Sequence, residues 1–241
     1  MTDELQAIAQ EYAARDRDRR LRARYRLTNP GQLFLVQQRE RRLLALLVRH
    51  GFAERLGAAR ILDIGCGSGG LLLDLLRYGA RADRLAGVDL VPERVARARA
   101  RLPAADLRCV SATALPYPDA SFDLVCQMLV FSSLLEAATA RQVAAEMRRV
   151  VRPDGLIVWY DLRRNNPRNP RVRGISPAAL AALFPGCAVE ATPATLAAPL
   201  ARRIAPRAWL LAELLERIPL LRTHLLAAIR PPGAGSGAAG T

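Results

Sequence analysis

Short apolar runs alternate with amphipathic stretches along most of the 241-residue chain. The apolar runs predict strands at residues 61–64, 85–90, 107–111, 122–128, 156–161, 188–192 and 223–229. The amphipathic stretches predict helices near 69–78, 92–101, 137–150 and 177–184. Strands that take turns with helices are typical of a mostly parallel sheet covered on both faces. The pattern therefore predicts an α/β fold.

Helical segments are also expected outside this alternating region. Residues 4–24 and 32–50 read as helices separated by the turn signal Thr28-Asn29-Pro30-Gly31. A segment at 197–221, with a helix near 203–218, is inserted before the last strand. We therefore expect an N-terminal helical extension or lid at 1–55, an α/β domain at 56–230 and a disordered Pro- and Gly-rich tail at 231–241.

The composition excludes a disordered chain and says little about partners. Apolar residues make up 51% of the sequence, enough to bury a sizeable core. All 36 basic residues are arginine, against 22 acidic residues, for a net charge of +14. Because lysine is absent altogether, the charge looks like a compositional bias, and it favours nucleic acid binding only weakly.

Neither a metal site nor a membrane span is expected. Cys66, Cys109, Cys126 and Cys187 are widely spaced, and the chain has only two histidines, so a zinc site or a disulfide framework has little support. The longest apolar stretches are far shorter than the ~20 residues that span a bilayer. The acidic N-terminus does not resemble a secretory signal. We expect a cytoplasmic protein without a metal.

The most informative stretch is a glycine-rich turn between the first strand and a helix. Gly65-Cys66-Gly67-Ser68-Gly69-Gly70 follows Ile61-Leu62-Asp63-Ile64 directly. A turn without Cβ atoms lets a ligand approach the backbone, and the following helix points amide hydrogens at it. The spacing satisfies both G-x-G-x-x-G and G-x-G-x-G, so the turn alone does not choose between a dinucleotide and another nucleoside cofactor.

Two acidic residues accompany this turn. Asp89 ends the next strand, where a carboxylate can accept both hydroxyl groups of a ribose. Asp63 lies two residues before the first glycine. A negative charge repels a bound phosphate but attracts a cation. The two acids together favour a positively charged cofactor that carries a ribose.

With these residues the chain resembles the class I S-adenosylmethionine-dependent methyltransferases of the small-molecule type. The resemblance is strongest over about residues 60–161, where it includes the segment from Ala114 to Val125 and the turn Arg152-Pro153-Asp154-Gly155. The last two predicted strands, at 188–192 and 223–229, also resemble the closing pair of that family. The resemblance implies a Rossmann-like doubly wound, mostly parallel seven-stranded sheet with an antiparallel last strand. It also implies S-adenosylmethionine as cofactor and S-adenosylhomocysteine as product.

The resemblance assigns cofactor-binding roles. Asp63 and the Gly65–Gly69 backbone would hold the methionine part and Asp89 the ribose hydroxyls. Ser111 and Ala112 would lie beside the adenine; many relatives carry Asp in place of Ser111, so a weaker hydroxyl contact is expected here. The expected cofactor contacts are therefore Asp63, Gly65, Cys66, Gly67, Gly69, Asp89, Leu90, Ser111, Ala112, Gln127 and Met128.

An acceptor should bind against the ends of the fourth and fifth strands. Asp161 is the first candidate for a general base, with Tyr160 and His224 behind it. The loop at 163–173 contains five arginines and no acid, so we expect it to recognise an anionic acceptor, although a solvated arginine loop is an open alternative. The expected acceptor contacts are Tyr25, Phe131, Arg163, Asn165, Asn166 and Arg173.

The sequence therefore predicts methyl transfer to a small anionic or partly apolar acceptor, with O-methylation favoured. Three alternatives stay open. A nicotinamide-dependent dehydrogenase shares the glycine spacing, and an RNA methyltransferase is suggested by the charge. A cofactor-binding protein without catalysis would keep the same turn. The sequence does not set the oligomeric state.

Overall fold

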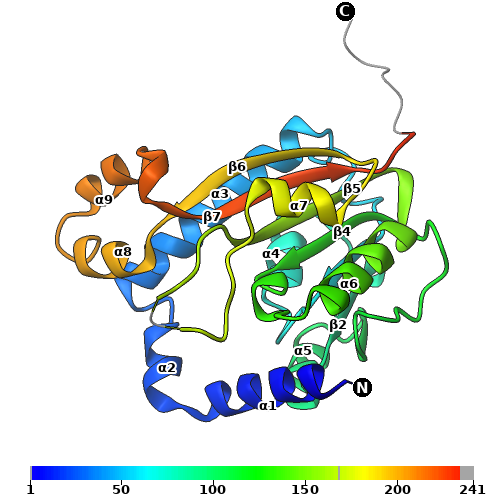
Figure 1. Ribbon diagram of the computed structural model, residues 1–241, viewed down its shortest axis with the longest axis horizontal. Coiled ribbons are helices and arrows are strands. Elements are labelled where there is room, and N and C mark those ends of the chain that lie inside the picture. The colour runs from blue at the N-terminus through cyan, green and yellow to red at the C-terminus, as the bar shows by residue number, and fades with distance from the viewer. Residues whose placement is uncertain (1, 168, 234–241) are drawn as a thin grey trace, which may run out of the picture.

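The computed structural model describes residues 2–167 and 169–233. Within these ranges the chain forms one seven-stranded sheet of order β3-β2-β1-β4-β5-β7-β6 (Figure 1). Only β7 runs antiparallel to its neighbours. The strands are β1 (Ile61–Ile64), β2 (Leu85–Asp89), β3 (Asp106–Cys109), β4 (Phe122–Met128), β5 (Val151–Leu162), β6 (Ala188–Leu196) and β7 (Arg222–Arg230). The predicted doubly wound fold is confirmed, including the antiparallel last strand.

Nine α-helices occur in the described part of the chain: α1 (Asp3–Arg17), α2 (Arg19–Arg24), α3 (Pro30–Arg49), α4 (Gly70–Arg77), α5 (Pro92–Arg101), α6 (Ala137–Val150), α7 (Pro177–Leu183), α8 (Ala198–Ile204) and α9 (Trp209–Glu216). Three 3₁₀ turns accompany them, at η1 (Ala82–Arg84), η2 (Phe131–Ser133) and η3 (Pro219–Leu221). Among the residues described, no helix has the length and apolarity needed to cross a membrane.

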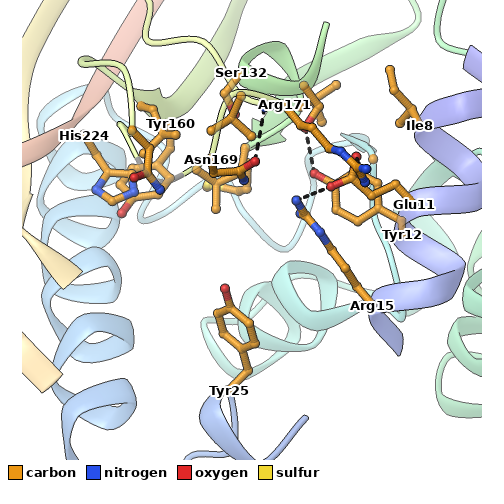
Figure 2. A pocket seen from close by; sticks show the side chains of 18 of the residues that line it. Ile8, Glu11, Tyr12, Arg15, Tyr25, Ser132, Tyr160, Asn169, Arg171 and His224 are labelled. Atoms are coloured by element: carbon orange, nitrogen blue, oxygen red, sulfur yellow. Dashed lines mark hydrogen bonds and ion pairs between the residues drawn. The ribbon is translucent and has the colours of Figure 1, made fainter. Parts of the chain in front are cut away.

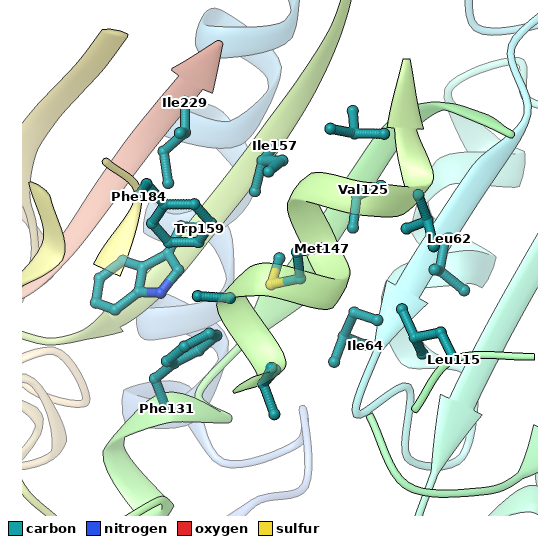
Figure 3. Packing of buried hydrophobic residues seen from close by; sticks show 14 of the residues in the cluster. Leu62, Ile64, Leu115, Val125, Phe131, Met147, Ile157, Trp159, Phe184 and Ile229 are labelled. Atoms are coloured by element: carbon teal, nitrogen blue, oxygen red, sulfur yellow. The ribbon is translucent and has the colours of Figure 1, made fainter. Parts of the chain in front are cut away.

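Helices cover both faces of the sheet. On one face Met147 of α6 packs with Val125, Ile157 and Trp159 of the central strands (Figure 3). On the other face α3, α4 and α5 bury apolar side chains such as Leu47 against the strands. Because the middle of the sheet is covered twice, all four residues of β1 are buried, which explains why β1 reads as a continuous apolar run with one acid.

Two helices expected to be continuous are each divided. The predicted helix at 4–24 ends at Arg17, and Asp18 begins α2 by accepting hydrogen bonds from the Arg20 and Leu21 amides. The predicted helix near 203–218 is wrong in extent, because the insertion forms α8 and α9. Pro206 stands between these two helices and has no amide hydrogen, so it cannot continue the hydrogen bonds of α8.

The strand order places the site. From β1 the chain adds β2 and β3 on one side of the sheet, and then adds β4 and β5 on the other side. Ligands of such sheets bind beyond the carboxyl ends of the strands where the strand order changes direction, here between β1 and β4. Helices α1 and α2 lie along one side of the molecule, well away from β6 and the C-terminal end of β7 (Figure 1). The division of the chain at residue 55 stays a prediction. Of the predicted tail, residues 234–241 lie outside the described residues.

Candidate active site

The glycine turn after β1 has a backbone that only glycine adopts easily. Gly65, Gly67 and Gly69 have φ angles of +70°, +53° and +80°. A Cβ atom on Gly65 would lie 2.5 Å from Val130 Cγ2, so the turn also packs tightly against the end of β4. The Gly65 and Cys66 amides donate to the Val88 carbonyl oxygen, which joins the turn to β2. The turn is therefore held open at the strand ends.

Asp89 is fixed by the same turn. Its Oδ2 accepts a hydrogen bond from the Gly67 amide at 2.9 Å, and its Oδ1 accepts one from the Val91 amide at 2.9 Å. Each oxygen keeps a lone pair for a ligand. The carboxylate is thus oriented by backbone groups and lines a cavity at the carboxyl end of the sheet.

Asp63 lacks the partner that a buried carboxylate needs. The residue is buried, and its Oδ1 has no hydrogen-bond partner in the structure. Burial raises the pKa of this carboxyl well above its ordinary value, and the nearby Asp89 charge raises it further. A cationic group bound beside the turn would supply the missing partner.

The cavity has a volume of about 1250 Å³. It is bounded by strand ends, by α1, α2 and α3, by the loop after β5 and by α8. Figure 2 shows side chains from several of these segments turned toward it. The sequence-predicted residues that line it are Gly65, Asp89, Leu90, Ser111, Ala112, Met128, Tyr160, His224, Tyr25, Asn165 and Asn166.

Several other predicted cofactor residues stand beside the cavity and support it. Gln127 is fully buried; its Oε1 accepts from the Val130 amide at 3.0 Å. Cys66 is buried against Gly87, and burial raises the pKa of its thiol, so it is not a nucleophile at neutral pH. Ser111 lines the cavity, but its hydroxyl already pairs with Thr113 Oγ1 at 2.7 Å.

The structure does not bring Phe131, Arg163 or Arg173 to the cavity. Phe131 is fully buried in the core, where its ring lies near those of Trp159 and Phe184 (Figure 3). Arg163 Nη1 donates to the Pro219 carbonyl oxygen at 3.1 Å. Local sequence gave no sign of these long-range contacts.

Asp161 is also turned away from the cavity lining. It is fully buried, its Oδ2 accepts from the Ser132 amide at 3.1 Å, and its Oδ1 accepts from the Leu162 amide at 2.8 Å. Burial raises its pKa to about 6, against the opposing effect of hydrogen bonds from Ser132 and neighbouring amides. The arrangement makes Asp161 an anchor for the turn after β4.

Tyr160 and His224 form a neutral stacked pair in the cavity wall (Figure 2). Their rings are 4.9 Å apart and nearly parallel, and the Tyr160 hydroxyl lies 2.8 Å from Thr195 Oγ1. Burial raises the pKa of Tyr160 to about 12. Burial, assisted by the Arg39 charge, lowers the pKa of His224 to about 4. Both rings are therefore uncharged near neutral pH.

Two strained residues face the same cavity. Leu129 and Thr195 have φ angles of +64° and +60°, a region that side chains with a Cβ rarely adopt. Both line the cavity, and strain of this kind is concentrated at functional sites. Neither position carries a sequence signal, because leucine and threonine give no hint of a left-handed backbone.

Helix α1 closes one side of the cavity through polar contacts. The Tyr12 hydroxyl lies 2.8 Å from Ser133 Oγ, and Asp16 accepts from Arg94 Nε at 3.0 Å and Nη2 at 2.6 Å. Glu11 lies 3.5 Å from the Arg171 guanidinium (Figure 2). The pKa of Asp16 is lowered, chiefly by the hydrogen bond from Arg94. These contacts join α1 to α5, to η2 and to the loop after β5.

Arginines dominate the charged lining. Besides Glu11, Asp16 and Asp89, the charged residues that line the cavity are Arg15, Arg22, Arg24, Arg39, Arg94, Arg164, Arg171 and Arg202. Sequence reasoning missed Arg39 and Arg202, which come from α3 and α8, more than 20 residues from any recognisable motif. In the described ranges no group of three or more His, Cys, Asp or Glu side chains is arranged to hold a metal.

Comparison with known proteins agrees with this geometry. The family model described as "Methyltransferase domain" matches residues 62–159, which include the glycine turn and Asp89. The matched region, residues 62–159, belongs to a family of methyltransferase domains, and the curated relatives that it resembles include S-adenosylmethionine-dependent methyltransferases. This membership separates the glycine turn from that of the dehydrogenases, which shares its spacing.

Two curated relatives and one solved structure illustrate the family. A protein of Mycolicibacterium smegmatis named "probable S-adenosylmethionine-dependent methyltransferase" is 34% identical over 52% of this chain and 49% of its own. A malonyl-[acyl-carrier protein] O-methyltransferase of Halorhodospira halophila is 38% identical over 44% of this chain and 35% of its own. The chain thus spans half or less of the length of these curated relatives.

The solved structure shows the fold. An S-adenosylmethionine-dependent methyltransferase of Mesorhizobium loti superposes with a TM-score of 0.55 and 20% identity, covering 73% of this chain and 93% of that one.

The residues of this methyltransferase domain fit S-adenosylmethionine. Asp63 provides an unpaired buried oxygen on the side of the turn, and Asp89 provides two oriented oxygens next to it. Arg39 lines the cavity, and its charge reaches the Asp63 carboxyl, whose pKa it lowers against the effect of burial. An ammonium and a carboxylate on one ligand would satisfy Asp63 and Arg39 together.

Proposed function

We propose that this protein transfers a methyl group from S-adenosylmethionine to an oxygen atom of a small anionic, partly apolar acceptor. The observation that carries the proposal is the buried Asp63 Oδ1, which has no hydrogen-bond partner and lies just before a glycine turn whose Gly65 lines, with Asp89, a cavity of about 1250 Å³. A single small ligand usually occupies a pocket of roughly 300–1000 Å³. The volume supports simultaneous binding of a cofactor and an acceptor.

The cofactor supplies an activated methyl group on a cationic sulfur. The chain's own residues bind and orient it: Asp63 and Arg39 would hold its amino acid part, and Asp89 its ribose hydroxyls. Ser111 and Ala112 would flank the adenine. Met128, at the end of β4, lines the cavity and would exclude water from the reacting atoms. Holding two reactants in line is the main contribution such a site makes to the rate.

The protonation states of the cavity favour an acceptor that is already ionised. Tyr160 holds its proton to about pH 12, so its hydroxyl does not act as a base near neutrality. His224, with a pKa of about 4, is a weak base. A carboxylate or an enolate needs no strong base for attack through oxygen. The O-methylation named for the Halorhodospira relative supports the same chemistry.

An anionic group of the acceptor has a matching site between α2, α3 and α8. Arg202 lines the cavity, its Nη2 donates to Gln32 Oε1 at 3.1 Å, and its guanidinium stacks over the Tyr25 ring at 5.4 Å. Its Nε is buried without a hydrogen-bond partner. Burial lowers the pKa of Arg202, and the like charge of Arg24 lowers it further. Among the residues that the structure describes, neither arginine forms an ion pair.

The packing of α3 against α8 fixes this arginine. A Cβ atom on Gly31 would lie 2.5 Å from the Arg202 Cα, so the two helices meet backbone to backbone. An uncompensated guanidinium held in place beside an apolar wall of Leu35 and Val36 suits a carboxylate or phosphate on an apolar stem. We therefore propose Arg202, with Arg24 and Tyr25, as the acceptor's anion site.

We also propose that the reaction takes place in the cytoplasm. All four cysteines are free thiols, which a reducing compartment preserves.

The proposed function is tested by incubating the protein with methyl-labelled S-adenosylmethionine and a panel of acyl carboxylates, enolic acids and alkyl phosphates. Each acid is matched by its neutral amide or alcohol. The proposal predicts label transfer to at least one anionic compound and at least tenfold less to its neutral match. Transfer to neutral or cationic amines alone would contradict it. The Asp89→Ala variant serves as the control without cofactor binding.

A further inference from the structure

Helix α9 turns both of its glutamates inward and exposes most of its leucines. Its two glutamates point inward to α3, where Glu213 Oε1 accepts from Arg41 Nη2 at 2.7 Å and Glu216 pairs with Arg42. Three of its four leucines are exposed: the exposed fractions of Leu210, Leu211 and Leu214 are 78%, 48% and 57%, whereas Leu215 packs against the apolar cluster that contains Ala212. A surface helix normally buries its leucines and exposes its acids.

The exposed apolar surface continues past the end of α9. Ile218 and Leu220, in and just before η3, are 45% and 66% exposed. We call Leu210, Leu211, Leu214, Ile218 and Leu220 the outer leucine face. These five residues lie within eleven positions of the chain, whereas single exposed apolar residues need no explanation. A cluster of this kind marks an interaction surface.

The exposed charged residues that flank α9 along the chain are all arginines, namely Arg203, Arg207 and Arg217. The only acids of the insertion, Glu213 and Glu216, are already paired with arginines of α3. Leucines beside unpaired arginines have the composition of helices that lie in the interface of a negatively charged bilayer.

We propose that the outer leucine face docks on the surface of an anionic lipid bilayer. The leucines enter the boundary between headgroups and acyl chains, and Arg203, Arg207 and Arg217 lie against phosphate groups. A second copy of the chain is a poorer occupant, because a symmetric dimer would bring these arginines together with no free acid to separate them. The docking does not depend on the identity of the methyl acceptor.

Docking would place the cavity next to the bilayer. Helix α8 joins α9 to the cavity, since Ala198, Pro199 and Arg202 of α8 line its wall. An acceptor with an apolar stem would then reach the cavity without crossing bulk water.

The experiment is flotation of the full chain with vesicles made of equal parts phosphatidylglycerol and phosphatidylcholine, compared with phosphatidylcholine alone. Tryptophan fluorescence gives a second readout, because Trp159 is fully buried in the core and Trp209, the only other tryptophan, begins α9 and is partly exposed. Lipids brominated in the acyl chain should quench Trp209 on binding.

The double variant Leu210→Ser/Leu214→Ser tests the leucines, and Val48→Ser is the matched control, since Val48 is 62% exposed on α3 outside the face. We expect binding to the anionic vesicles only, weakened at least ~10-fold in the leucine variant and unchanged in the control. The double variant Arg207→Gln/Arg217→Gln should weaken binding by roughly fivefold for each arginine. If the leucine variant does not fold, the arginine variant still tests whether this face binds anionic vesicles.

Three results would overturn the proposal. In the first, the wild-type chain is found only in the unbound fraction. In the second, it binds with an affinity that neither double variant changes. Light scattering could instead reveal a dimer that the leucine variant converts to a monomer without any vesicle binding, and the face would then be an interface between copies.

Discussion

Asp63 and Asp89 occupy neighbouring strand ends, yet only Asp89 has its carboxylate oxygens bonded by backbone amides of the site. The difference gives them different tasks. Asp89 is oriented in advance to accept hydrogen bonds from neutral hydroxyl groups, whereas Asp63 is buried without a partner and would be stabilised by a bound cation. The phosphates of a dinucleotide would supply no positive charge to Asp63 and would repel its carboxylate. This pair of acids therefore favours a sulfonium nucleoside with an ammonium group.

Arg39 should recognise the carboxylate of the cofactor. Replacing Arg39 by Gln removes one charge-assisted hydrogen bond, so we expect the dissociation constant for S-adenosylmethionine to rise about 10-fold or more. Affinity for the decarboxylated analogue should not change. Calorimetry with both ligands makes the measurement, and Arg41→Gln on the same helix is the control. Equal losses for both ligands would mean that Arg39 acts through the fold alone.

Arg202 should set the Michaelis constant for the acceptor. The variant Arg202→Gln is expected to raise KM for an anionic acceptor about 10-fold or more, and to leave the affinity for S-adenosylmethionine unchanged. Arg203→Gln, one position along α8 and not part of the cavity lining, should change neither. An unchanged KM in Arg202→Gln would place the anion elsewhere, with the loop at 163–173 as the next candidate.

At the scale of elements, α1 is attached by side-chain contacts to the rim of the cavity. The pairing of Asp16 with Arg94 and Arg97 and the Tyr12 contact with Ser133 hold α1 across segments that are distant in sequence. Leu5 is the only fully buried residue of α1, so the attachment of the helix depends largely on these few polar contacts. Elements held in this way open more readily than the rest of a fold.

The variant Asp16→Asn should therefore release α1. We expect cleavage by trypsin within α1 and α2, which are rich in arginine, to accelerate about 10-fold, because a charge-assisted contact is lost. The acceptor KM should rise as the cavity loses one wall. Asp18→Asn is a close control, since Asn caps a helix as well as Asp does and Asp18 holds only the start of α2. Equal cleavage of both variants would show that α1 is not held by Asp16.

The elements that could be predicted from the sequence are those whose pattern is local. The bounds of β1, β4, α5 and α6 agree with the apolar pattern, because the two strands are almost entirely buried and each helix buries one periodic apolar face. The division of the insertion into α8 and α9 was not predicted, although Pro206 was a visible signal.

The cofactor side of the site was more predictable than the acceptor side. The glycine turn and Asp89 belong to one strand–turn–helix unit and the strand beside it, so chain order determines their geometry. Arg202 meets Tyr25 across 177 positions, and Arg39 reaches the cavity only because α3 packs on the sheet. Such contacts depend on tertiary packing and leave no local pattern. The same reason explains why Phe131 and Arg163 lie elsewhere.

At the scale of the whole molecule, the buried titratable groups give stability an identifiable pH dependence. Burial raises the pKa of Asp161 from 3.8 to about 6, so the folded chain binds more protons than the unfolded chain between pH 4 and pH 6. Stability therefore falls through this window as pH rises, by roughly 3 kcal/mol for this group. His224, whose pKa falls from 6.5 to about 4, has the opposite effect, since its stabilisation is lost as pH decreases through the same range.

The variant Asp161→Asn isolates the contribution of Asp161. We expect the unfolding free energy of the wild type, relative to Asp161→Asn, to decrease by roughly 3 kcal/mol from pH 4 to pH 7. Urea denaturation at each pH unit makes the measurement. A difference that stays constant across this range would show that Asp161 is ionised in the fold at pH 4.

The most direct test of the account is calorimetric titration of the wild-type chain with S-adenosylmethionine, S-adenosylhomocysteine and NADH. The account predicts saturable heat with both sulfur nucleosides at about one ligand per chain, loss of that heat in Asp89→Ala, and none with NADH. Absence of heat with either sulfur nucleoside, or saturable binding of NADH at the glycine turn, would contradict it.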